Sequence, residues 1–244
     1  MSVPTAEKTW VPLTPPERRV VGVLIEKQKT TPEYYPMSVA ALVSGCNQKS
    51  NRDPITNYDA DDIDEILQGL RRKGAVIQVE GTGRVVRWKH ALYEWLDLKN
   101  RPVEMAVVAE LLLRGPQTEG ELRSRASRME DIPDLSRLQE VLEFLAGRGL
   151  VIYLTPPGQR RGVVVTHGLY PPEELARVRE AHRQAAPVEE PRAIRTAPGP
   201  APGPAPAPVW AAEAAALRQE MEALRQTVAT LAAEVDALKT ALGA

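Results

Sequence analysis

Two stretches of this chain share one pattern of apolar positions. Residues 59–79 align without a gap on residues 134–154. In both, apolar residues recur with the i, i+3, i+4 and i+7 spacing of a helix that buries one face. A glycine then follows, Gly74 or Gly149, and glycine favours the left-handed conformation that ends helices. The matching apolar pairs are Ile63/Leu138, Ile66/Val141, Leu67/Leu142, Leu70/Leu145, Val76/Val151 and Val79/Leu154. The repeat predicts two equivalent helices, each leading into an apolar strand.

A hairpin is predicted after each of these helices. Residues 75–80 and 84–88 flank Gly81-Thr82-Gly83, and residues 150–154 and 163–166 flank a longer loop. Glycine-containing loops between β-branched runs are typical of hairpins.

Two more helices precede each copy. Thr14-Pro15-Pro16-Glu17 and Thr118-Glu119-Gly120-Glu121 are capping boxes that open helices, and a further helix begins near Ser38. Three helices followed by a two-stranded wing are the order of a winged helix. We therefore predict an α+β, mainly helical fold with tandem winged-helix domains, or alternatively two unrelated α+β domains. The predicted divisions are an N-terminal tail at 1–12, winged helix 1 at 13–90, and winged helix 2 with a trailing helix at 91–185.

The composition changes after this region. Residues 186–209 form a Pro/Ala-rich segment, in which proline removes backbone donors and fixes φ. Such a segment is predicted to be a disordered, semi-rigid linker. The alternative is a ligand for a proline-binding module.

The linker leads to a heptad pattern at 210–243. Leucine recurs every seven residues at d, with an apolar residue at a four positions later. The predicted coiled-coil seam comprises Leu217, Met221, Leu224, Val228, Leu231, Val235, Leu238 and Leu242. Valine at a with leucine at d favours two parallel strands, so we predict a homodimer through this C-terminal coiled-coil helix. Pairing with another protein, or folding back on the core, are the alternatives.

Composition narrows the functional classes. The formal net charge is -1, whereas dedicated nucleic-acid-binding proteins are often markedly basic. No apolar run is long enough to span a membrane and no signal peptide is visible, so we expect a cytoplasmic protein without a membrane segment. Cys46 is the single cysteine, and the three histidines lack ligand-like spacing. With no phosphate loop either, we expect no enzyme, no cofactor, no metal site and no small-molecule substrate.

A family resemblance covers about residues 13–167. Residues 25–38 and 45–55, which include Gly45-Cys46-Asn47-Gln48-Lys49-Ser50-Asn51-Arg52-Asp53-Pro54, closely resemble the signature of the YceH family of bacterial proteins. Residues 111–118 and 121–126 are also similar to that family. The resemblance implies a tandem winged-helix fold and implies no biochemical activity.

Nucleic-acid binding is the main function to consider for a winged helix, because the third helix of DNA-binding proteins with this fold enters the major groove. In the first half this helix begins with acids that repel phosphate, Asp59, Asp61, Asp62, Asp64 and Glu65. The candidate contacts there precede it: Lys49, Asn51 and Arg52, with Asn47 and Gln48 beside them. These residues either contact nucleic acid or shape a structured loop.

The second half carries more arginine. Its candidate contacts with nucleic acid or a partner are Arg123, Arg125, Arg128, Arg137 and the wing-tip residues Arg160 and Arg161. A wing arginine can enter a minor groove while the others hold phosphates. Acids are interspersed among them, so a mixed, solvated surface is the alternative. Two hypotheses follow: a DNA-binding transcriptional regulator, or a scaffold whose winged helices bind protein without contacting DNA.

Overall fold

A computed structural model describes residues 10–80, 85–156 and 162–185. These residues belong to one compact unit, which is α+β and mainly helical with small sheets. The predicted linker, the coiled-coil seam and the wing-tip arginines Arg160 and Arg161 lie outside the described residues.

The first half of the unit consists of three helices, a short 3-10 turn and a hairpin. Its elements are α1 (Pro15–Thr30), η1 (Pro32–Tyr34), α2 (Val39–Cys46), α3 (Ala60–Arg72), β1 (Val76–Glu80) and β2 (Val86–His90). β1 and β2 pair antiparallel, and Met37 adds a single bridge to Trp88 of β2. The elements have the order expected of a winged helix.

The second half has the same order. Its elements are α4 (Leu92–Trp95), α5 (Pro102–Arg114), β3 (Gln117–Thr118), α6 (Glu119–Ala126), α7 (Leu135–Gly147), β4 (Val151–Tyr153), β5 (Val164–His167) and α8 (Pro172–Ala185). The sheet order is β3-β5-β4, so the segment before α6 joins the hairpin as Met37 does in the first half. The sequence predicted neither β3 nor α4, which are too short to carry a periodic pattern.

The predicted helix ends are confirmed. Thr14 and Thr118 each form a reciprocal capping box with the glutamate three residues later. Asp59 caps α3 in the same way, with Asp62 as its partner. Gly74 and Gly149 have φ of 73° and 71°, the left-handed conformation expected after α3 and α7.

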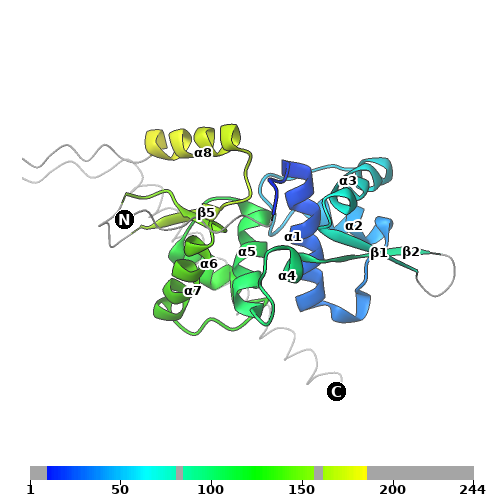
Figure 1. Ribbon diagram of the computed structural model, residues 1–244, viewed down its shortest axis with the longest axis horizontal. Helices are drawn as coiled ribbons and strands as arrows, with labels where there is room; N and C mark the ends of the chain where they lie inside the picture. The colour runs from blue at the N-terminus through cyan, green and yellow to red at the C-terminus, as the bar shows by residue number, and fades with distance from the viewer. Residues whose placement is uncertain (1–9, 81–84, 157–161, 186–244) are drawn as a thin grey trace, which may run out of the picture. The chain divides into compact units, whose positions relative to one another are not determined.

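Helices α1 and α5 lie side by side at the centre of the unit and share the most extensive contact in the fold (Figure 1). Residues 17–26 of α1 and 104–113 of α5 are buried without interruption, so both helices are covered on all sides. A Cβ on Gly22 would lie 2.9 Å from Cδ2 of Leu113, which shows how closely the two backbones approach. This contact joins the two halves, whose relative placement the sequence left undetermined.

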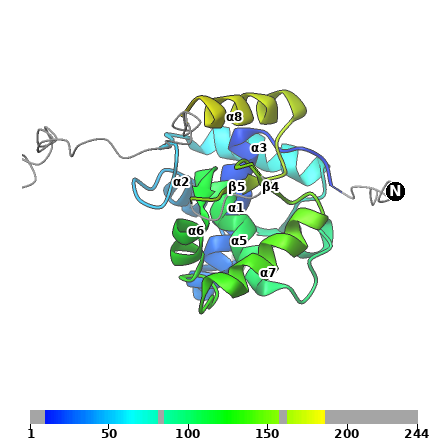
Figure 2. The same ribbon diagram turned by 90° about the vertical axis from the view of Figure 1, so that its left-hand side faces the viewer.

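Helix α8 lies on the outside of the unit in both views (Figure 1; Figure 2). None of its residues is buried. It is attached to α1 by an ion pair between Glu174 and Arg18, in which both guanidinium Nη atoms contact the carboxylate.

Candidate functional site

The exposed N-terminal part of α3 is acidic, whereas its last turn carries the exposed Arg71 and Arg72. Asp61, Asp64 and Glu65 are exposed, while Asp59 and Asp62 are engaged in the cap. Carboxylates in the first turn also interact favourably with the helix dipole, which explains why they are tolerated there. The face that a winged helix would present to DNA therefore carries unpaired negative charge.

Helix α7, the corresponding helix of the second half, is similar. Glu140 and Glu143 are exposed, and the one arginine near its start, Arg137, donates to Glu140 over 2.9 Å. Gln139, which could read a base edge, instead donates to Glu119 over 3.2 Å. In its N-terminal half, neither third helix offers an uncompensated positive charge to phosphate; the exposed Arg71 and Arg72 lie in the last turn of α3.

The arginines of α6 make contacts within the protein. Arg123 donates to the carbonyl oxygens of Ile132 and Pro133, at 3.2 and 3.1 Å. Arg125 donates to Oε1 of Gln117 over 2.7 Å and to Glu121 over 3.2 Å. Both side chains hold the turn and strand around α6 in place, so a nucleic acid would have to compete for them.

Arg128 joins the two halves of the unit. Its guanidinium pairs with Glu26 of α1 through one nitrogen and with Glu110 of α5 over 3.0 Å through the other. Both carboxylate side chains are at most 2% exposed, whereas that of Arg128 is 28% exposed. Its expected role as a phosphate contact is corrected to that of a bridge between α1 and α5.

Arg52 belongs to the same cluster, and its side chain is fully buried, which favours the structured-loop alternative over a nucleic-acid contact. It forms a two-pronged ion pair with Glu26 and donates to the carbonyl oxygen of Gly45 over 3.0 Å. Burial alone would raise the pKa of Glu26, but the hydrogen bonds and charges of Arg52 and Arg128 outweigh burial and hold that pKa below its ordinary value. Arg52 thus cannot contact a nucleic acid without unfolding this cluster.

The rest of the segment 47–58 is a structured loop. The side-chain amide of Asn47 both donates to and accepts from the backbone of Tyr58, and Asn51, at φ 58°, accepts from Arg114 over 2.9 Å. Of the three candidate contacts in this loop, only Lys49 is exposed. The alternative in which these polar residues shape a loop accounts for Asn47, Asn51 and Arg52.

Sequence reasoning missed the two carboxylates at the centre of this cluster. Glu26 follows the apolar run 20–25, and Glu110 interrupts the run 105–113. A charged residue within or beside an apolar run could have revealed them. Such a residue is expected to be buried, and a buried charge requires a partner. The partners come from a distant loop and from the other half of the unit, which a one-dimensional pattern does not specify.

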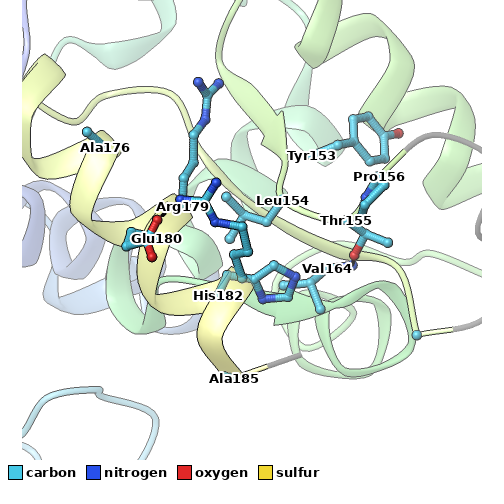
Figure 3. A pocket seen from close by; sticks show the side chains of 12 residues that line it. Tyr153, Leu154, Thr155, Pro156, Val164, Ala176, Arg179, Glu180, His182 and Ala185 are labelled. Carbon is cyan, nitrogen blue, oxygen red and sulfur yellow. Dashed lines mark hydrogen bonds and ion pairs between the residues drawn. The ribbon is translucent and has the colours of Figure 1, made fainter. Parts of the chain in front are cut away.

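A cleft of about 710 Å³ lies between α8 and the β4–β5 hairpin. Figure 3 shows Arg179, Glu180 and His182 of α8 facing Leu154 and Val164 of the hairpin. The cleft mixes apolar walls with basic and acidic groups and has no arrangement typical of catalysis.

The described residues contain no cluster of metal-binding side chains, and the thiol among them is buried. Within residues 10–80, 85–156 and 162–185, no three His, Cys, Asp or Glu side chains converge in a way that could hold a metal ion. Cys46 is fully buried, and burial raises the pKa of its thiol to about 12, which suppresses the reactive thiolate. In the same ranges, no helix has the length and apolar character needed to cross a bilayer.

The fold and these contacts define a winged-helix-like α+β protein whose two halves are joined by a buried ion-pair cluster. The chain belongs to the family described as "Protein of unknown function, DUF480", which matches residues 13–159. This membership confirms the resemblance to the YceH family.

Several relatives share most of the described unit. A UPF0502 protein of Rhodopirellula baltica is 52% identical over 163 residues, covering 67% of each chain. A UPF0502 protein of Geotalea daltonii is 52% identical and covers 61% of this chain and 67% of its own. One of Shewanella piezotolerans is 39% identical and covers 74% of this chain and 86% of its own.

Among solved structures, the chain matches subunit VPS25 of the endosomal trafficking complex ESCRT-II. The match has 20% identity and a TM-score of 0.22, and covers 66% of this chain and 92% of that one. A superposition this partial says nothing about function.

Proposed function

We propose that this protein is a protein-interaction scaffold built from tandem winged helices, and that α3 and α7 do not read DNA. The observation that carries the proposal is the exposed carboxylates of both third helices, with Asp61, Asp64 and Glu65 in the N-terminal half of α3 and Glu140 and Glu143 on α7. Like charges placed against phosphates cost several kcal/mol, so these faces suit a basic protein surface instead.

Other features of the proposal come from the sequence. The coiled-coil helix would pair two copies in parallel, so that two winged-helix units act together in one cytoplasmic assembly. Bivalent attachment raises avidity without new contacts, provided that the linker lets both units reach the partner. The proposal includes no catalytic activity, no cofactor and no small-molecule substrate.

A DNA-binding regulator is the second candidate, and one feature favours it. Arg160 and Arg161 fall in the segment that connects β4 to β5, the position of a wing tip. Wing arginines can insert into a minor groove without help from the third helix. In that case DNA binding would depend on these two residues rather than on Arg52, Arg123, Arg125, Arg128 or Arg137.

The scaffold proposal predicts that partner binding depends on the α3 surface. We expect the triple substitution Asp61→Asn, Asp64→Asn and Glu65→Gln to abolish capture of a partner that the wild-type protein retains. All three residues are exposed and Asp62, which closes the cap, is left intact, so the fold should be unaffected. The measurement is quantitative affinity capture with purified, immobilised full-length protein.

The control is Glu33→Gln, Glu94→Gln and Asp131→Asn. These residues are also exposed and their replacement changes the net charge equally, but they lie outside α3 and α7. The control should retain the partner. Equal capture by all three proteins would rule out the α3 surface as the docking face.

A further inference from the structure

A second cleft, of about 380 Å³, lies at the junction of the two halves and α8. The start of α1 lines it with Arg18 and Arg19, the end of α5 with Arg114, and α8 with Glu174. The turn at Asp53 and Pro54 completes the wall beside α1. Three guanidinium groups from two helices therefore meet around one cavity, which is within the size range of small-molecule sites.

Arg19 is the exceptional residue in this wall. It is only 3% exposed, yet no described carboxylate lies within ion-pair distance of its guanidinium. Nη2 donates to the carbonyl oxygen of Pro54 over 2.5 Å, while Nη1 is buried with no hydrogen-bond partner among the described residues. A buried charge without an ion-pair partner is costly, and the other two buried arginines among the described residues, Arg18 and Arg52, have Glu174 and Glu26.

The surrounding charges do not remove this imbalance. Burial lowers the pKa of Arg19 and the positive charge of Arg52 lowers it further, and these effects outweigh the opposing effect of Asp53 on the cleft wall. An arginine remains protonated at neutral pH nonetheless, so the charge persists. Its neighbours on the cleft are otherwise occupied: Arg114 pairs with Glu110 over 3.1 Å, and Arg18 with Glu174.

The carboxylate of Glu174 contacts Arg18 in the way that a bound anion would. Both Nη atoms of Arg18 contact the carboxylate of Glu174, one of them over 3.0 Å. Forked contacts of this kind are how arginine holds carboxylates and phosphates. Glu174 is on α8, the helix without buried residues, so this carboxylate is held by an element with few other attachments.

We propose that the cleft formed by Arg18, Arg19, Arg114 and Pro54 binds an oxyanion, the phosphate or carboxylate group of a small molecule. The anion supplies the ion-pair partner that Arg19 lacks among the described residues. Glu174 occupies the fork of Arg18 and competes with the ligand, so binding loosens α8 from α1. The site differs from the partner-binding surface of α3 and does not depend on it.

The test is a thermal-unfolding titration of the full-length protein with inorganic phosphate, against sodium chloride at equal ionic strength. A ligand that binds the folded state raises Tm in a saturable manner. We expect a rise of about 3 °C beyond the chloride control. A parallel titration with citrate distinguishes the two chemistries, because a carboxylate site responds to citrate more strongly than to phosphate. No rise with either anion would overturn the proposal.

Three variants locate the site. Arg19→Met should abolish the phosphate-dependent rise, whereas Lys99→Ala, which removes an exposed cation outside the cleft, should retain it. Glu174→Gln should tighten phosphate binding at least about threefold, because it frees the fork of Arg18. If Arg19→Met does not fold, the phosphate affinity of Glu174→Gln tests the proposal instead. The proposal is contradicted if Glu174→Gln binds phosphate no more tightly than wild type. It is also contradicted if Arg19→Met folds and still shows the full phosphate-dependent rise in Tm.

Discussion

Replacing Glu26 by alanine is expected to lower the free energy of unfolding by about 3–5 kcal/mol, the usual cost of removing one partner from a buried ion pair. Glu26 is paired with Arg52, whose side chain is 0% exposed, and with Arg128. Without the carboxylate, the charge of Arg52 remains buried and uncompensated. The link that Arg128 makes between α1 and α5 is weakened as well. Urea denaturation followed by circular dichroism measures the difference.

Glu140→Ala is the matched control for this substitution. Glu140 is also on a helix and pairs with an arginine, but its side chain is 68% exposed and that of Arg137 is 42% exposed. Exposed pairs contribute at most about 1 kcal/mol, so this variant should be nearly as stable as wild type. Equal losses for the two variants would mean that the buried cluster does not hold the halves together.

Acidification from pH 6.5 to about pH 4 is expected to destabilise the fold by up to about 3 kcal/mol through His90. Burial, with a smaller effect of the Lys29 charge, lowers the pKa of His90 from 6.5 to about 4. The unfolded chain therefore takes up the proton first as pH falls. Stability is complete above pH 6.5 and is lost on approach to pH 4. His167, whose pKa burial also lowers, contributes in the same direction.

The contacts of His90 define the control for this prediction. Its Nδ1 accepts from the backbone N–H of Leu92 over 3.2 Å, so the neutral ring carries its proton on Nε2, 2.8 Å from Oε1 of Gln28. His90→Asn preserves an acceptor near Nδ1 but cannot titrate. Between pH 6.5 and pH 5 its stability should fall less steeply than that of wild type, as measured by urea denaturation at each pH. Identical slopes would show that His90 titrates alike in the folded and unfolded chain.

The sequence predicted the local structure of this protein well. The caps at Thr14 and Thr118 and the glycines after α3 and α7 are where the pattern placed them, because these signals act within a few residues. Strand ends moved by one or two residues: the second strand of the first hairpin is Val86–His90 rather than 84–88. Strand ends depend on pairing with a neighbour, which local sequence does not fix.

The packing of the two halves against each other, and the burial and ion-pair partners of the arginines, were harder to predict. The uninterrupted apolar runs in α1 and α5 indicated helices buried on more than one face, although only one face was assigned. Arg128 was a candidate surface contact, and Arg52 was left open between a nucleic-acid contact and a loop-shaping role, because charge along a chain does not reveal burial. Arg52 pairs with Glu26, and Arg128 pairs with both Glu26 and Glu110. The two glutamates are far apart in sequence, and the contact of α1 with α5 brings them together.

The central claim, that α3 and α7 do not read DNA, is tested most directly by fluorescence anisotropy with a labelled mixed-sequence duplex, at low and near-physiological salt. Phosphate contacts produce affinity that falls steeply as salt rises. The account predicts no micromolar binding at near-physiological salt, and predicts that any low-salt binding disappears in the Arg160→Ala, Arg161→Ala variant. Micromolar, salt-sensitive binding that survives in this variant would contradict it and show that the helical surfaces contact DNA.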